Sequence, residues 1–286
     1  MKDSTFRIYW TSIIPQAAKI LGRLWYKVHN NRRRIAVDNL MLAMKFPKEK
    51  AEKVALANFT HLARVFLEFP LLPHCNEHNL LGMLSLDGPD FFLETAKRHR
   101  GFFIMTGHIG NWELMAYASP VLFNVSLDVI IRPLDNPWLN NLVTSIRTKT
   151  GNRMIPKKLA TKKIRQSIKN GRIVAMLMDQ KSSHNEGIYV PFFNRKVLTH
   201  KGLALLAIKM NRPVLPVYNH RQKWGDYKIY VARPIYPPPK EYGDVKARVY
   251  KMTTDFNALF EAIVRKDPIQ WYWIHRRFRH SIEFTN

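Results

Sequence analysis

The chain has 286 residues, which is enough for one large domain or two small ones. With 46% hydrophobic and 12% aromatic residues, its composition excludes a disordered or linker-like protein. Forty-six Lys and Arg against 21 Asp and Glu give a net charge of +25, so we expect an anionic partner. A single cysteine, Cys75, excludes an internal disulfide and a zinc finger, and we interpret it as a small apolar core residue.

The N-terminal segment is aromatic and basic, but it is too short in apolar residues to predict a membrane span. Only eleven uncharged residues separate Arg7 from Lys19, whereas a span needs about 20 predominantly apolar ones. No signal peptide is predicted either. Two interpretations of residues 8–28 stay open: an ordinary helical hairpin packed on the core, or an anchor in the lipid headgroup layer. The anchor would use Trp10, Arg23, Trp25, Tyr26 and Lys27.

The spacing of apolar residues predicts helices from residue 1 to about 85, with 51–72 the clearest, and alternating strands and helices from Arg100 onward. Strands are predicted at 101–106, 126–132, 172–179, 213–218 and 227–232. Further helices are predicted at 111–122, 138–150, 159–170, 199–210 and 244–266. Because alternating strands and helices form largely parallel sheets, the predicted fold class is α/β: a helical N-terminal subdomain, then a mostly parallel mixed sheet flanked by helices. The short Pro237–Pro239 run is no linker, so we predict one domain over residues 1–286, divided near residue 85.

The most specific local motif is Gly107-His108-Ile109-Gly110-Asn111-Trp112-Glu113, where a predicted strand turns into a helix. Open α/β sheets bind ligands at such turns. The glycines loosen the backbone, so that Glu113 can hold the Nδ1–H of His108 and leave Nε2 as a general base. A His–acid dyad without a covalent nucleophile suits the removal of a proton from an alcohol that attacks an activated acyl group. The alternative is a helix-capping glutamate beside an unrelated surface histidine.

The segment from Thr106 to Glu113 resembles the HxxxxD/E box of the glycerolipid acyltransferase superfamily, in the version of the bacterial lipid A secondary acyltransferases of the lauroyl/myristoyl type. Further blocks agree in order with that family. They are Ala36-Val37-Asp38-Asn39-Leu40 with Phe46-Pro47, Arg132-Pro133-Leu134-Asp135-Asn136-Pro137, Asp179-Gln180 with Val190-Pro191-Phe192-Phe193, and Pro268 to Phe278. The resemblance covers about residues 35 to 280.

The resemblance implies that His108 and Glu113 are catalytic. It implies supporting or substrate-binding roles for Asn111, Arg132, Arg147, Asp179, His275, Arg276 and Arg277. Simpler interpretations stay open for several of these residues. Arg147 is also placed for an exposed cation over an apolar stripe, and Asp179 for a turn or cap. Arginines 276 and 277 could grip phosphates bidentately or form a solvated basic tail.

The resemblance further implies transfer of a fatty acyl chain from an acyl carrier protein thioester, or from acyl-CoA, to a hydroxyl of a lipid A precursor or similar anionic glycolipid in lipopolysaccharide biosynthesis. No metal or other cofactor is expected, because the thioester is already activated. The expected partners are acyl carrier protein, the anionic lipid acceptor and the membrane surface. We expect a monomer attached peripherally to the cytoplasmic face of the bacterial inner membrane, with a membrane-facing part at about 1–85 and a catalytic core at about 86–286.

Three alternative functions stay open: one differs in the acceptor lipid, and two belong to other classes of protein. The acceptor could be another membrane lipid, such as a phosphoglycolipid or an aminolipid. A thioester or lipid hydrolase is chemically close, although the Gly-x-Ser-x-Gly motif is absent from the sequence. The net charge also fits a nucleic-acid-binding protein, but the sequence has no zinc-finger, basic-zipper or RNP-type motif, so no nucleic acid is expected.

Overall fold

The computed structural model describes residues 3–158, 160–222 and 225–284, and contacts divide the chain into two compact units. Unit 1 consists of Met1–Ser12, Leu67–Leu177 and Met210–Tyr236, and unit 2 of Ile13–Phe66, Met178–Lys209 and Pro237–Asn286. Each unit combines separate stretches of the chain. The predicted single domain with a change near residue 85 stays a prediction.

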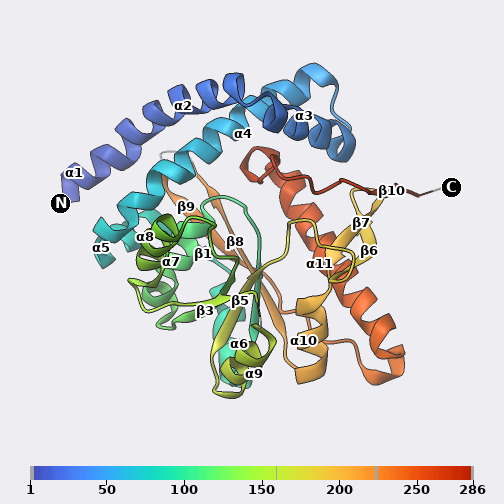
Figure 1. The fold of residues 1–286 in the computed structure, drawn as a ribbon. Coiled ribbons are helices and arrows are strands. Elements are labelled where there is room, and N and C mark those ends of the chain that lie inside the picture. Colours follow the sequence, from blue (N-terminus) through green and yellow to red (C-terminus); the bar gives the residue numbers. More distant parts are fainter. Residues whose placement is uncertain (1–2, 159, 223–224, 285–286) are drawn as a thin grey trace. The chain divides into compact units, whose positions relative to one another are not determined.

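Unit 1 is built on a mixed sheet with the strand order β1-β9-β8-β2-β5-β3-β4 (Figure 1). The strands are β1 (Leu84–Asp87), β2 (Phe103–Thr106), β3 (Leu127–Ile131), β4 (Arg153–Pro156), β5 (Ile173–Leu177), β8 (Val214–Arg221) and β9 (Tyr227–Val231). From β8 to β4 the strands are parallel, with Ile104 of β2 opposite both Ala175 and Leu215. Only the pairing of β8 with β9 is antiparallel within this sheet as described, which confirms the predicted mostly parallel mixed sheet.

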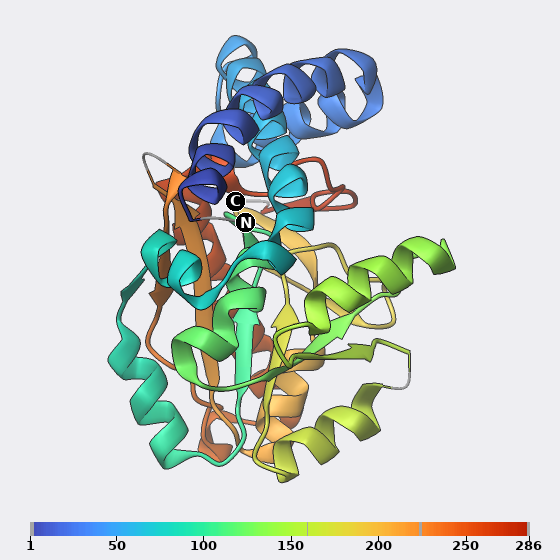
Figure 2. The same cartoon turned by 90° about the vertical axis from the view of Figure 1, so that its left-hand side faces the viewer.

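Helices of unit 1 pack against this sheet, because the apolar side chains of its strands must be covered. All four residues of β2 are buried, as expected for a strand covered on both faces. Figure 2 shows the sheet with the helices against it. They include α6 (Pro89–Arg98), α7 (Trp112–Phe123), α8 (Pro137–Thr148) and α9 (Ala160–Lys169), and α1 (Asp3–Ile8) and α5 (Glu77–Met83) also belong to unit 1. The core includes Phe92, Phe102, Ile104, Leu127, Val129 and Leu215.

Local capping explains where α7 and α8 begin. The Asn111 side chain accepts a hydrogen bond from Leu114 N, which starts α7. Asn136 does the same for Leu139 N at the start of α8, where Pro137 occupies the first turn. Asparagine caps satisfy backbone donors that the first helical turn leaves unpaired, so the sequence itself fixes these boundaries.

Unit 2 is mainly helical, with a small antiparallel sheet of order β10-β7-β6. Its elements are α2 (Ile14–Val28), α3 (Asn30–Met44), most of α4 (Lys48–Glu68), β6 (Gly187–Phe192), β7 (Arg195–His200), α10 (Gly202–Met210), α11 (Val245–Lys266) and β10 (Ile282–Glu283). Gly22 lets α2 approach α4 closely, because a Cβ there would lie 2.4 Å from the Cα of Thr60. The two ends of the unit that are far apart in sequence also meet: Asn39 Nδ2 donates to the carbonyls of Trp273 and His275.

Some predicted elements differ from the structure. The predicted helix 199–210 begins only at Gly202, because Thr199 and His200 pair with Ile188 and Gly187 in the β6–β7 hairpin. The edge strands β1 and β4 were not predicted, since four residues give too short a periodic pattern. Leu159, at the start of the predicted helix 159–170, lies outside the described residues.

Candidate active site

The turn between β2 and α7 brings His108 and Glu113 to the carboxyl edge of the sheet in unit 1. The backbone of Gly110 has φ +60°, and a Cβ there would lie 2.2 Å from the backbone oxygen of Asn219, so a side chain does not fit. The half-buried His108 ring packs edge to face on Trp112, with 5.0 Å between the ring centroids. Glu113 follows in the first turn of α7. The local turn chemistry therefore places the two predicted catalytic residues at a ligand-binding edge.

Glu113 forms an ion pair with Arg147, which lies in the last turn of α8. Arg147 Nε donates to Oε2 over 2.9 Å, and Nη2 donates to Oε1 over 2.5 Å. The indole N–H of Trp112 donates to Oε1 over 3.1 Å. The Glu113 side chain is only 12% exposed and that of Arg147 is 28% exposed, so water screens the bidentate ion pair between them weakly. Arg147 thus contacts the carboxylate of the predicted dyad, while a bond between His108 and Glu113 stays a prediction.

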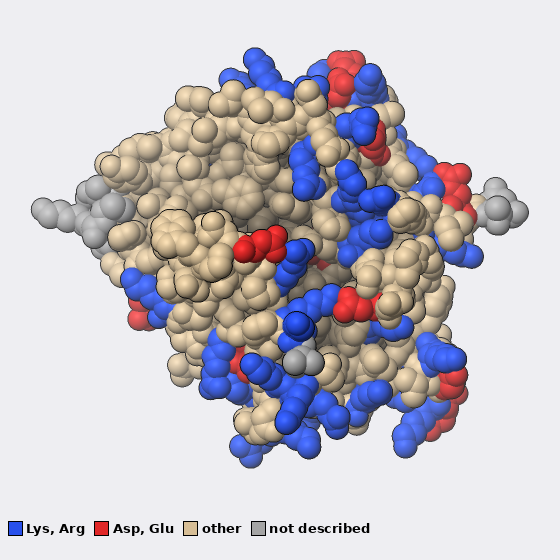
Figure 3. All heavy atoms as spheres, in the orientation of Figure 1, with Lys and Arg blue, Asp and Glu red and all other residues tan. Residues whose placement is uncertain are grey.

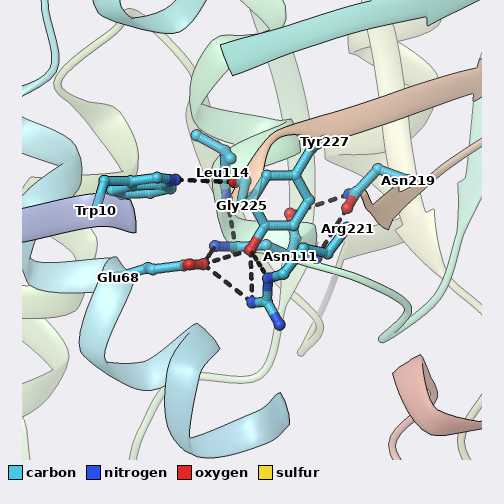
Figure 4. Close-up of polar contacts among 8 residues, drawn as sticks. All are labelled: Trp10, Glu68, Asn111, Leu114, Asn219, Arg221, Gly225 and Tyr227. Atoms are coloured by element: carbon cyan, nitrogen blue, oxygen red, sulfur yellow. Dashed lines mark hydrogen bonds and ion pairs between the residues drawn. The ribbon is translucent and has the colours of Figure 1, made fainter. Parts of the chain in front are cut away.

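Asn111 lies in the same turn and is completely buried. Its backbone N–H donates to Asn219 Oδ1 over 2.8 Å, and Asn219 Nδ2 donates back to its carbonyl over 3.0 Å. Its own Nδ2 donates to Glu68 Oε2 over 2.8 Å (Figure 4). With the cap to Leu114, every polar group of Asn111 has a protein partner. The predicted supporting residue therefore fixes the turn through contacts within the protein.

A buried carboxylate, Glu68 at the end of α4, is the centre of the network around Asn111. It also accepts hydrogen bonds from Arg221 Nη2 over 3.2 Å and from the hydroxyl of Tyr227. Burial by itself would lower the pKa of the Arg221 guanidinium, but the charge of Glu68 and the bonds to Tyr227 and Glu68 raise it. Glu68, Asn219, Arg221 and Tyr227 were not predicted from the sequence. One signal pointed to the first: Glu68 is the only charged residue in the apolar run 65–72.

Arg132, another predicted supporting residue, lies on the exposed loop after β3. Its Nη2 is 3.2 Å from Asp135 Oδ1, and both side chains are largely in solvent. Such surface ion pairs contribute about 0–1 kcal/mol to stability. The structure therefore places Arg132 in unit 1 but not among the contacts of Glu113.

In unit 2, Asp179 and Arg277 are bound to protein groups. The nearly buried Asp179 accepts a 2.9 Å hydrogen bond from the indole of Trp271. Arg277 is 2% exposed and donates to Leu198 O and Thr199 Oγ1, both over 2.8 Å. Burial lowers the pKa of Arg277 to about 10, against the opposing charge of Asp179. A phosphate grip by Arg277 would have to break these bonds, so its geometry favours a structural role.

The neighbouring Arg276 is exposed and lines a cavity of about 450 Å³ between α3 and the C-terminal segment. The cavity also has Arg34 and Arg279 in its lining, with Asp38 as the only acidic lining residue. Within the ranges that the structure describes, none of the three arginines forms an ion pair. Figure 3 shows that Lys and Arg side chains gather over this part of unit 2. His275, by contrast, is half-buried, and its carbonyl accepts from Asn39.

The structure contradicts one part of the predicted N-terminal anchor, the lipid-facing role of Trp10. Trp10 is 1% exposed, stacks on Phe6 and donates its indole N–H to Gly225 O over 3.1 Å, so it is a core residue. Trp25 and Tyr26 are half-buried and pack on Phe59. The exposed apolar side chains of α2 are aliphatic instead: Ile20, Leu21, Leu24 and Val28.

No helix in the described ranges is both long and apolar enough to cross a membrane. Nor do the described His, Cys, Asp and Glu side chains gather in groups of three or more that could hold a metal ion. The turn between β2 and α7 carries a histidine and a carboxylate held by arginine, and these residue types are used in general base catalysis.

The fold places a histidine and a glutamate at the carboxyl edge of an α/β sheet, and comparison with known proteins gives the family of the chain. Residues 6–280 match the bacterial lipid A biosynthesis acyltransferase family, and the chain belongs to this family. It is 23% identical to the lipid A biosynthesis lauroyltransferase of Escherichia coli K12 over 264 residues, 91% of this chain and 83% of the relative. Identity to the palmitoleoyltransferase of the same organism is 22% over 257 residues, 87% and 79% of the two chains. A lipid A biosynthesis acyltransferase of Haemophilus influenzae is 23% identical over 283 residues, 94% and 88%.

Proposed function

We propose that this protein transfers a fatty acyl group from a thioester, carried by acyl carrier protein or coenzyme A, to a hydroxyl of a lipid A precursor or similar anionic glycolipid. The observation that carries the proposal is the bidentate Arg147–Glu113 pair beside His108 at the carboxyl edge of the sheet. Family membership supports the acyl transfer, and the names of the relatives support lipid A as the acceptor class.

In the proposed mechanism, His108 is the general base. It takes the proton of the acceptor hydroxyl while that oxygen attacks the thioester carbonyl, so that a C–O bond forms and the C–S bond breaks. The departing thiolate then takes the proton back from the imidazolium, which restores the enzyme. Glu113, held in place by Arg147, orients the imidazole and stabilises its transient positive charge. The hydroxyl and the thioester supply all atoms, so the proposal includes no metal or other cofactor.

Direct transfer is favoured over an acyl-cysteine intermediate by the state of the only cysteine. Burial, together with the charge of Glu68, raises the pKa of the Cys75 thiol to about 12. Because the thiolate is the nucleophile, such a thiol is nearly unreactive at neutral pH.

The excess of cations supports two anionic partners. The net charge of +25 suits an acidic carrier protein as donor. The arginine-lined cavity between α3 and the C-terminal segment suits a phosphate on the acceptor, because guanidinium groups bind phosphate bidentately. We therefore assign Arg34, Arg276 and Arg279 to acceptor binding within this proposal.

The surface of α2 supports peripheral attachment to an anionic membrane, which we place at the cytoplasmic face of the inner membrane. The helix exposes aliphatic side chains, carries Lys19, Arg23 and Lys27, and contains no acidic residue. An amphipathic helix of this kind lies in the headgroup layer, with its apolar face inserted and its cations near lipid phosphates.

The activity is tested by incubating the purified protein with an acyl carrier protein thioester and a detergent-dispersed lipid A precursor. We expect release of the carrier thiol together with a lipid whose mass has grown by one acyl group. Thiol release without an acylated lipid would identify a hydrolase instead. Absence of thiol release from both the carrier protein and the coenzyme A thioesters would overturn the proposed reaction.

A further inference from the structure

The buried cluster of Glu68, Arg221 and Tyr227 contacts the turn between β2 and α7 through Asn111, whose Nδ2 donates to Glu68 Oε2. Glu68 comes from the end of α4, Arg221 from the end of β8 and Tyr227 from the start of β9 (Figure 4). Strands β8 and β9 are adjacent in the sheet. On its other side β8 pairs with β2, the strand that leads into the turn. The cluster therefore lies directly beside the turn that carries His108 and Glu113.

Asn111 joins this cluster to the segment that carries both predicted catalytic residues. It follows His108 by three residues and precedes Glu113 by two. Its side-chain nitrogen donates to Glu68, and its side-chain oxygen caps α7. Its backbone N–H and carbonyl are both bonded to the Asn219 side chain. A change in the position of Glu68 would thus shift the start of α7 and with it the Glu113 carboxylate.

Stability alone gives little reason for a charged group at this position. Replacing a complete buried ion pair with apolar residues is often neutral or stabilising, because taking two charges out of water is costly. Glu68 is 0% exposed and its partner Arg221 is 11% exposed, so both carry that cost. What an apolar pair could not supply is a fixed acceptor for the Asn111 amide. The cluster is better explained by its effect on geometry than by its effect on stability.

We propose that Glu68 is a positioning residue for acyl transfer: with Arg221 and Tyr227 it holds Asn111, and through Asn111 it fixes the relative position of His108 and Glu113. The inference about kcat rests on the proposed function. The inference about the turn does not, because the order of residues 107–114 can be measured without substrate.

The test compares Glu68→Gln, Glu68→Ala, Asn111→Ala and the Glu68→Ala/Asn111→Ala double variant. Asp128→Asn is the matched control, since it also breaks a buried carboxylate–arginine pair in unit 1, that of Asp128 with Arg172 at 2.6 Å. Asp128 lies near the amino end of β3, at the opposite edge of the parallel strands from His108.

We expect Glu68→Ala to lower kcat by about 10- to 100-fold with KM within twofold, since a displacement of about 1 Å in a catalytic group has effects of this size. Glu68→Gln, which keeps an oxygen acceptor for Asn111, should lose less. The double variant should lose no more than the worse single variant, because both act through one contact. Asp128→Asn should lower the melting temperature and leave kcat unchanged.

Amide hydrogen exchange of residues 107–114 gives the second readout. We expect exchange at least tenfold faster in Glu68→Ala, a smaller increase in Glu68→Gln, and no change in Asp128→Asn. Unchanged exchange in Glu68→Gln and Glu68→Ala would overturn the inference, even for a protein without acyltransferase activity. So would a wild-type kcat in folded Glu68→Ala, or losses that multiply in the double variant. A wild-type protein that fails to transfer acyl groups while the exchange result holds would overturn only the proposed function.

Discussion

Arg147, in the last turn of α8, donates two hydrogen bonds to Glu113, in the first turn of α7. Each charge lies at the helix end that favours it, because a helix dipole is positive at its N-terminus and negative at its C-terminus. The pair joins two segments 34 residues apart and holds the carboxylate beside the His108 turn. This relationship fixes the carboxylate on the turn that also carries the predicted base, and it is the basis of the first two predictions.

Replacing His108 with alanine should lower acyl transfer by about 10² to 10⁴, because a positioned general base is lost. Glu113→Ala should come close to this loss, since the imidazole loses its orientation and charge stabilisation. Transfer is measured by mass spectrometry of the lipid product, with circular dichroism to confirm folding. His99→Ala, before β2 and at the other edge of the sheet, is the control and should keep its activity. Wild-type turnover in folded His108→Ala would exclude the mechanism.

Arg147→Met should lower kcat/KM by at least tenfold, because it keeps most of the bulk of the side chain and removes both donors to Glu113. Arg147→Lys should fall between methionine and the wild type, since one ammonium cannot reproduce a bidentate guanidinium. The matched control is Arg98→Met, which breaks an exposed pair with Glu94. If Arg147→Met equals the wild type, the arginine only covers apolar surface.

The arginine-lined cavity predicts a separate effect on acceptor binding. Arg34→Gln and Arg276→Gln should each raise KM for a phosphorylated acceptor about 5- to 50-fold, since a hydrogen bond to a charged group contributes about 1.5–3 kcal/mol, reduced here by solvent exposure. KM for the acyl donor should not change. Lys251→Gln, the same loss of charge on α11, serves as the control. An equal rise in KM for the acceptor and for the acyl donor would contradict the assignment of these arginines to acceptor binding.

Attachment to membranes should depend on the aliphatic face of α2. Ile20→Asp and Leu24→Asp should weaken co-sedimentation with anionic liposomes, because each inserts a charge where an apolar side chain would enter the bilayer. Leu93→Asp, on an equally exposed site of α6, should leave binding unchanged. Binding should also weaken as salt screens Lys19, Arg23 and Lys27, each worth about 1 kcal/mol near such a surface, without vanishing. Point substitutions are preferable to deletion of residues 1–30, since Trp10 is a core residue.

The stability contributed by Asp128 should disappear in acid. Burial alone would raise the pKa of this carboxyl, but hydrogen bonds from Arg172 and Ser167 and the charges of Arg172 and Arg153 lower it below its ordinary value. A lowered pKa in the folded state means that the stabilisation is present above the unfolded-state value, about 3.9, and is lost as the pH falls through the folded-state value. Asp128→Asn should therefore cost about 1–3 kcal/mol at pH 7 and progressively less below about pH 4. Urea titrations at several pH values measure this; a constant difference would show that the carboxylate charge is not involved.

Sequence alone predicted the features that depend on neighbouring residues. The strands β2, β3, β5, β8 and β9, the helices α7, α8 and α11 and the turn from His108 to Glu113 follow from apolar periodicity, glycines and asparagine caps. Such patterns span a few residues, so they can be recognised without knowledge of the fold. The family resemblance came from the order of these local blocks.

The tertiary structure decided which polar and aromatic side chains are buried and what they contact. Glu68 meets Tyr227 across 159 residues, Trp10 meets Gly225 across 215, and Arg277 meets Thr199 across 78. A charge or an indole in a sequence suits solvent, a ligand or a buried partner equally well, and only the three-dimensional fold supplies the partner. For this reason the turn from His108 to Glu113 could be predicted from sequence, while the Glu68 cluster beside it and the core position of Trp10 could not.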